Sequence, residues 1–204
     1  MKINLNNKNI NIVNIAKKAL KDRKILSGLL EGILSKNEII RSNCFKVLML
    51  LSEEHPLLLY SKWDYFAELL YNDNAFLKFM AVQLIANLTN IDKENKFNKI
   101  FNKYYDLLND SVIVAGHITA NSGKIARAKP ELQIKITNKL LNIDKTSQKH
   151  KDLIKSGAIE SFSEYFNESK ERKKIIEFVK KQLNCESPKT RKTAKKFLKE
   201  WHIL

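Results

Sequence analysis

A short helical frame recurs along this chain and narrows its possible folds more than any other feature. The frame has a cap-like residue, a base four positions later, a small residue at seven and an apolar residue at ten. Its clearest copies are NEIIRSNCFKV (37–47), NAFLKFMAVQL (74–84) and SPKTRKTAKKF (187–197). Looser copies begin at 110 and 151, so that the starts recur at about 40 residues, a spacing typical of helical repeats.

Each position of the frame has a physical role. An Asn or Ser at the start accepts hydrogen bonds from the free N–H groups of the first helical turn. Ser187-Pro188 combines such a cap with a proline at the first helical position. A small residue allows two helices to approach closely. In the looser copies, Lys155 and Ala158 hold the basic and small positions, whereas Val114 and His117 hold them in the copy that starts at 110.

The spacing of apolar residues is helical over nearly the whole chain. Ala194, Phe197, Leu198 and Trp201 stand at offsets 0, 3, 4 and 7, which is one face of an α-helix. No segment shows the sustained alternation of a half-buried strand. With only five glycines and three prolines among 204 residues, the chain also lacks the many turns that a sheet protein needs. The sequence therefore predicts an all-α fold.

The three clear frames and their period resemble those of the HEAT/armadillo superfamily of helical repeats, over roughly residues 15 to 201. The resemblance implies a right-handed α-solenoid of about five helix pairs, with first helices on the convex side and second helices on the concave side. A helix bundle is the less favoured alternative. The implied organisation is one domain over 1–204, with a flexible Asn-rich N-terminus at 1–10, pairs at 11–35, 37–72, 74–109, 110–144 and 150–185, and a closing helix at 187–201.

The chain carries no recognisable catalytic or metal-binding pattern. Its four histidines and two cysteines show no metal-ligand spacing, and no phosphate-binding, dinucleotide-binding or nucleophile motif is present. We therefore expect no enzyme activity, no cofactor and no metal. The sequence also shows neither a signal peptide nor an apolar run long enough to cross a bilayer, which predicts a cytoplasmic protein without a membrane partner.

Positive charge is concentrated in the second half of the chain. Residues 111–204 hold 21 basic and 10 acidic side chains, or +11 of the net +15. Lysines recur on the polar faces of the expected second helices. If these helices line a concave surface, the stripes form a basic trough, although Lys is also common on any solvated helix face. The candidate binding residues are Lys96, Lys99, Lys103, Lys135, Lys139, Lys173, Lys174 and Lys181.

Two further pairs of residues are candidate sites. His117 and Asn121 are i, i+4 neighbours within the irregular stretch 111–130, where a tight helix contact is favoured over a ligand pocket. Trp63 and Asp64 are a second candidate because the fold resembles the HEAT-like alkylpurine DNA glycosylases, which use aromatic and acidic residues on their concave surface. That family's aromatic and acidic pattern maps onto no stretch of this chain, and Trp63 is favoured as a core residue, so a glycosylase-like activity is only a minor alternative.

These observations favour a non-enzymatic scaffold that binds an acidic protein or peptide on its concave face. The alternative is a solenoid that binds nucleic acid through the lysine stripes, with a connection to DNA repair. Because a field of one sign attracts any polyanion, the charge alone does not choose between these partners.

Overall fold

The computed structural model describes residues 4–7 and 9–203, and every regular element in that part of the chain is a helix. The prediction of an all-α fold is therefore confirmed. The structure divides into two compact units, Met1–Lys93 and Glu94–Leu204, which are described in turn. The single domain over 1–204 and the right-handed solenoid stay predictions.

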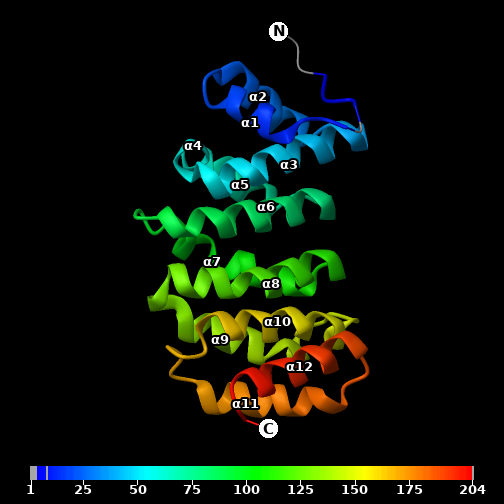
Figure 1. Cartoon of the computed structure of the whole chain (residues 1–204), viewed down its shortest axis with the longest axis vertical. Helices are drawn as coiled ribbons and strands as arrows, with labels where there is room; N and C mark the ends of the chain where they lie inside the picture. Colours follow the sequence, from blue (N-terminus) through cyan, green and yellow to red (C-terminus); the bar gives the residue numbers. More distant parts are fainter. Residues whose placement is uncertain (1–3, 8, 204) are drawn as a thin grey trace. The chain divides into compact units, whose positions relative to one another are not determined.

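The first unit is built around the long helix α3 (Glu38–Glu54), which packs against α1, α2, α4 and α6 (Figure 1). Its face toward these helices includes Val47, Leu48 and Leu51, all fully buried. The other elements of this unit are α1 (Ile12–Ala19), α2 (Arg23–Gly32), α4 (Pro56–Tyr60), α5 (Trp63–Leu69), α6 (Ala75–Leu88) and the 3-10 turn η1 (Thr89–Ile91).

Residues 4–7, which precede α1, are joined to α3 by hydrogen bonds. The buried side-chain amide of Asn43 donates to the carbonyl oxygens of Leu5 (3.0 Å) and Asn7 (2.8 Å). Asn37 donates through its side chain to Asn6. The flexible N-terminus predicted for residues 1–10 includes residues 1–3 and 8, which lie outside the described part of the chain.

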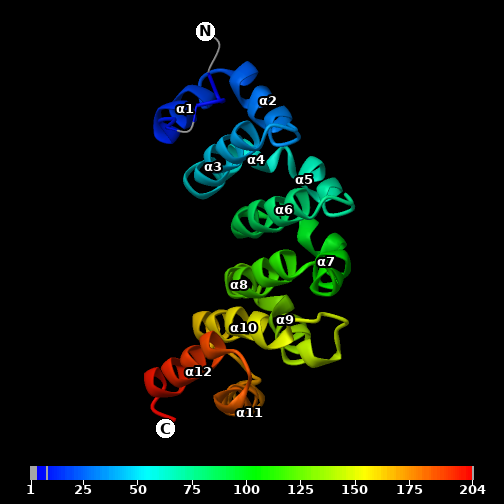
Figure 2. The same ribbon diagram turned by 90° about the vertical axis from the view of Figure 1, so that its right-hand side faces the viewer.

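The second unit arranges its helices in two rows (Figure 2). One row contains α8, α10 and α12, with α10 in contact with both of the others, and the second row contains α7, α9 and α11. The helices are α7 (Lys96–Asp106), α8 (Val112–Ala128), α9 (Gln133–Leu141), α10 (Lys151–Tyr165), α11 (Arg172–Lys181) and α12 (Pro188–Glu200). Short 3-10 turns are η2 (Leu107–Asn109), η3 (Pro130–Leu132), η4 (Ile143–Lys145) and η5 (Gln182–Asn184).

The helix caps confirm the predicted helix starts at the three clear frames, whereas α8 and α10 start one residue away from prediction. Asn37, Asn74 and Ser187 each accept a hydrogen bond from the first turn of the helix that follows. The caps of α8 and α10 are Ser111 and His150, each one residue away from the predicted start. The Ser111 side chain accepts from Val114 N–H and so caps α8, whereas His150 makes no side-chain cap and only precedes the first residue of α10.

The corrected phase changes which residues hold the frame positions in α8 and α10. Counted from the observed caps, the small position falls on Ile118 and Gly157, not on His117 and Ala158. The basic position falls on Ala115 and Ile154, not on Val114 and Lys155. These two helices therefore lack the base, and Lys155 has a different role.

When the basic position of the frame is an arginine, its side chain holds the loop that precedes the helix. Arg41 donates through Nη1 to the carbonyl oxygen of Ser35, six residues earlier, at 2.9 Å. Arg191 donates to the equivalent carbonyl of Cys185 at 2.7 Å and to that of Glu186 at 2.8 Å. The same position thus performs the same structural task in α3 and α12.

Close approach of α8 and α10 depends on glycine. A Cβ atom on Gly157 would lie 2.5 Å from Thr119 Oγ1 and 2.9 Å from the backbone nitrogen of Ala120. At Gly123 the backbone N–H donates to Ser161 Oγ at 2.8 Å, and this hydroxyl donates onward to the carbonyl of Thr119 at 2.5 Å. Within the stretch 111–130, the favoured tight contact is present at Gly123, where a Cβ atom would lie 2.7 Å from the carbonyl oxygen of Ser161, whereas Gly116 has open space.

Candidate functional site

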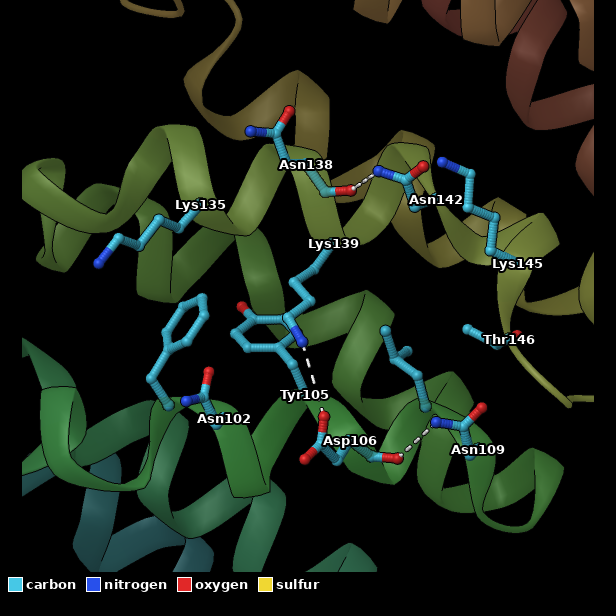
Figure 3. Close-up of a pocket in the computed structure, with 12 residues that line it drawn as sticks. Asn102, Tyr105, Asp106, Asn109, Lys135, Asn138, Lys139, Asn142, Lys145 and Thr146 are labelled. Carbon is cyan, nitrogen blue, oxygen red and sulfur yellow. Dashed lines mark hydrogen bonds and ion pairs between the residues drawn. The ribbon is translucent and has the colours of Figure 1, made fainter.

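A polar groove of about 500 Å³ lies between α7 and α9 in the second unit (Figure 3). Amide and ammonium side chains dominate its wall, and two aromatic rings contribute to its floor. It is lined by Phe101, Asn102, Tyr105, Asp106, Leu108, Asn109, Lys135, Asn138, Lys139, Asn142, Lys145 and Thr146. Such a concave surface with convergent polar groups is the usual form of a binding site.

The amphipathic pattern of the two helices turns these polar groups toward the groove. In α7, Phe97, Phe101 and Tyr104 are buried, which leaves Asn102 and Asp106 on the exposed face. In α9, Ile136 and Leu140 are fully buried. Between them, Lys139 projects toward Asp106 of α7 (Figure 3).

Beneath the groove, two buried tyrosines are anchored to neighbouring helices. The hydroxyl of Tyr105 donates to Ser122 Oγ of α8 at 3.1 Å, and that of Tyr165 lies 2.9 Å from Thr137 Oγ1 of α9. Burial raises the pKa of both phenols above the ordinary value, so they remain neutral. These contacts make the floor a fixed support for the polar wall.

Part of the polar wall is already engaged. Lys139 Nζ lies 3.6 Å from Asp106 Oδ1, across the groove from α9 to α7. The side chain of Asn142 donates to the carbonyl of Asn138 at 2.7 Å. The carboxamide of Asn109 donates to the carbonyl of Asp106 and accepts from the backbone N–H of Ser147 at 2.8 Å, which holds the loop after η4.

The rest of the wall is available to a ligand. In Figure 3 no hydrogen bond joins the side-chain amides of Asn102 and Asn138 to the residues drawn. Lys135 and Lys145 form no ion pair with the described residues, and both are exposed. Two amides and two ammonium groups that line the groove therefore have no partner among the described residues.

The structure brings together two of the eight lysines predicted for a basic trough. Lys135 and Lys139 line the groove, whereas the other six lie elsewhere on α7 and α11. Among the latter, Lys96 lies 3.7 Å from Glu94, and Lys174 lies 2.6 Å from Glu171. Local carboxylates therefore neutralise part of the predicted stripe.

Asn102, Lys145 and Thr146 are among the groove residues that sequence reasoning missed. Asn102 follows Lys99 by three residues and precedes Asp106 by four, so helical spacing alone could have placed it on the lysine stripe. Lys145 and Thr146 come from the turn after α9, and no helical period predicts where a turn will lie.

His117 borders a different, smaller cavity of about 350 Å³ between α8 and α10. Burial lowers the pKa of its imidazole below the ordinary value. Asn121 does not line this cavity, because its amide donates to the backbone carbonyl of His117 at 2.8 Å. The two residues predicted as one local site are thus joined through the main chain of α8, and only His117 faces the cavity.

Trp63 is part of the core of the first unit. Its ring is 1% exposed and packs edge-on against Tyr60 at 5.8 Å, whereas Asp64 is exposed in the first turn of α5. The core interpretation of Trp63 is confirmed. An aromatic residue sealed inside the protein offers no stacking surface to a nucleobase.

Comparisons with protein-family models, with curated proteins and with solved structures find no match to this chain. Within the described residues, no group of three or more His, Cys, Asp or Glu side chains is placed to hold a metal ion. None of the helices described here combines the length and apolar character needed to cross a bilayer.

Proposed function

We propose that this protein is a helical-repeat scaffold, of the α-solenoid kind, that binds an extended acidic peptide segment in the groove between α7 and α9. The observation that carries the proposal is the meeting of unpaired amides and lysines in that groove. Asn102 of α7 and Asn138 of α9 line this groove together with Lys135, Lys139 and Lys145, and Figure 3 shows Lys139 directed across it toward Asp106.

The two kinds of side chain suit the two parts of an acidic peptide. A carboxamide has both a donor and an acceptor, so Asn102 and Asn138 can pair with the N–H and C=O groups of a main chain. Ammonium groups form charge-assisted hydrogen bonds with Asp and Glu side chains. A peptide would thus be held through its backbone by the amides and selected for negative charge by the lysines.

The Lys139–Asp106 pair adds selectivity to this arrangement. Asp106 repels an acidic ligand at one edge of the groove and holds Lys139 in place through a 3.6 Å contact. A ligand carboxylate must compete with Asp106 for this lysine, which favours ligands whose acidic groups match the spacing of the bases. Such a like-charge element narrows the range of accepted partners.

Nucleic acid binding along the lysine stripes of α7, α9 and α11 is the second candidate function. The predicted stripes supply exposed charge at Lys99, Lys135, Lys173 and Lys181. The pairing of Lys96 and Lys174 with glutamates weakens the case for nucleic acid binding, because a polyanionic backbone requires unneutralised charges.

A fluorescently labelled peptide with alternating Glu and Ala residues tests the proposal by anisotropy at 100 mM salt. We expect Asn102→Ala together with Asn138→Ala, and Lys135→Gln together with Lys145→Gln, each to weaken binding at least tenfold. Lys173→Gln with Lys181→Gln is the control for charge, because these residues are exposed on α11 outside the groove.

Equal losses in the lysine pair and its control would show that net charge, and not the groove, attracts the peptide. Failure of the wild-type protein to bind the acidic peptide, together with salt-dependent duplex binding that is lost in Lys99→Gln with Lys135→Gln, would favour the second candidate.

A further inference from the structure

The C-terminal end of the second unit carries an unusually dense positive charge. Residues 170–200 include twelve basic and four acidic side chains, so this segment holds +8 of the chain's net +15. The segment forms α11 and α12, which pack against each other (Figure 2). It shares no residue with the groove between α7 and α9.

Five lysines of α12 are exposed and form no ion pair with any described residue: Lys189, Lys192, Lys195, Lys196 and Lys199. Four of them, at offsets 0, 3, 7 and 10 from Lys189, follow one face of the helix over about 15 Å. The opposite face is committed to packing, because Ala194, Phe197 and Leu198 are almost fully buried.

Helix α11, which contacts α12, carries further exposed bases. Arg172, Lys173, Lys180 and Lys181 are exposed, and no carboxylate of the described residues lies within ion-pairing distance of them. Lys174 alone on this helix is neutralised, by Glu171 at 2.6 Å. We call the five lysines of α12 and these four bases of α11 the basic end patch.

We propose that the basic end patch binds the sugar–phosphate backbone of double-stranded nucleic acid. Unpaired ammonium groups along a rigid helix supply point charges at fixed spacing, which is what a regular row of phosphates requires. The patch contains eight lysines and one arginine. Arginine forks are the groups that read guanine edges, so a lysine-rich patch predicts contact without base specificity.

The surroundings of the patch favour a duplex over a single strand. Single-stranded nucleic acid is usually held by bases stacked on exposed aromatic rings. The aromatic side chains of these helices are instead turned inward: Phe197 is 1% and Phe178 7% exposed, and Trp201 packs on Phe166 at 4.8 Å between ring centroids. A duplex offers its phosphates without any stacking.

The same inward packing argues against a membrane surface as the partner. A helix that lies in a bilayer interface buries an apolar face among the lipids. The apolar face of α12 is already buried against the protein, and none of the large apolar side chains that are strongly exposed in the described chain lies beyond Leu153. The patch therefore offers charge alone.

The test measures binding of a labelled 24-base-pair duplex of random sequence by fluorescence anisotropy between 50 and 200 mM salt. Because each neutralised phosphate adds about 0.9 to the salt slope, about five contacts imply a loss of affinity of 10²–10³-fold over this range. Substitution of Lys189, Lys192, Lys196 and Lys199 by Gln should lower affinity at 100 mM salt at least tenfold and reduce the slope by about 3 to 4.

The matched control substitutes Gln for four exposed lysines of the first unit: Lys17, Lys21, Lys24 and Lys36. Both variants have the same net charge, and Gln supports a helix about as well as Lys. Circular dichroism checks that each variant is folded. The control should keep the wild-type affinity and salt slope.

Three outcomes would overturn the proposal. The wild-type protein could fail to bind the duplex, or both variants could lose affinity equally, which would assign the effect to net charge. Vesicles with 30% phosphatidylserine could bind the patch more tightly than the duplex does, which would identify a lipid surface as the partner. The acidic-peptide assay of the groove is unaffected by any of these results, so the two proposals fail independently.

Discussion

The ammonium group of Lys155, whose side chain is 7% exposed, lies 2.7 Å from Asp144 Oδ1. The same nitrogen is 3.0 Å from Asp152 Oδ1. Asp152 also accepts the backbone N–H of Glu186 at 2.8 Å through Oδ2, and its carbonyl accepts from Thr190 Oγ1. One buried lysine in α10 thus connects the turn after α9 with the start of α12.

Loss of this ammonium group should destabilise the second unit. In Lys155→Met the two aspartates keep their charge without a partner, and we expect the free energy of unfolding to fall by about 1–2 kcal/mol. The value is moderate because Asp144 is largely exposed. Urea denaturation measures it, with Lys149→Met, an exposed neighbour, as the control. Equal midpoints for the two variants would contradict the role given to Lys155.

Stability should also fall in acid through Asp152. Although burial acts to raise the pKa of this carboxyl, hydrogen bonds from Lys155 and from Glu186 N–H together lower it below the ordinary 3.8. A carboxyl with a lowered folded pKa contributes stability that is complete above its unfolded pKa and is lost as pH falls through the folded value. Unfolding free energies measured from pH 6 to pH 2 should therefore decline below about pH 4.

The variant Asp152→Asn isolates this contribution. Its stability at pH 6 should be lower than that of the wild type, and the difference should shrink as the pH falls below 4. An acid limb that is equally steep in both proteins would place the titration on another carboxyl.

A methyl group at position 157 should lower the free energy of unfolding, whereas one at position 116 should not. Gly157→Ala would bring Cβ to 2.5 Å from Thr119 Oγ1 and 2.9 Å from a backbone atom of α8, which forces the helices apart. We expect a loss of about 1–3 kcal/mol. Gly116→Ala meets nothing within 4 Å and should gain about 0.5–1 kcal/mol through helix propensity. Thermal unfolding that ranks the two variants in the opposite order would refute the close contact.

Even a conservative substitution of Arg191, whose side chain holds the loop before α12, should be destabilising. Arg191 donates to the carbonyls of both Cys185 and Glu186 from the one nitrogen Nη1, and Lys in its place keeps the charge but loses the longer, planar guanidinium that positions this nitrogen. We expect Arg191→Lys to cost about 1 kcal/mol and to speed hydrogen exchange in residues 185–190. The exposed Lys192→Arg is the control, and similar exchange in both variants would show that the Arg191 contacts are dispensable.

The sequence predicted most of the helices because capping and apolar spacing are local properties. Asn37, Asn74 and Ser187 cap their helices as predicted, since the residue type alone satisfies the first turn. The frame in α10 was placed one residue late because Lys155 looked like its base. Its charge serves Asp144 and Asp152 instead, which no local pattern reveals.

The candidate site was only partly predictable for a related reason. Helical phase placed Lys135 and Lys139 on an exposed face, and the structure places them in the groove. The opposing Asn102 and the contribution of Lys145 depend on how α7, α9 and the following turn lie together. That arrangement is set by buried contacts such as Tyr105 with Ser122, between residues distant from the groove-lining lysines in sequence.

The Ser161 hydroxyl accepts from Gly123 N–H and donates to the Thr119 carbonyl, so it joins α10 to α8 within one row of the second unit. Sliding of one of these helices along the other would break both buried hydrogen bonds at once. Between α7 and α9 the groove is open, and the Lys139–Asp106 ion pair that crosses it is exposed to solvent. A ligand that enters there would compete with a solvent-exposed contact and leave the buried hydrogen bonds between α8 and α10 intact.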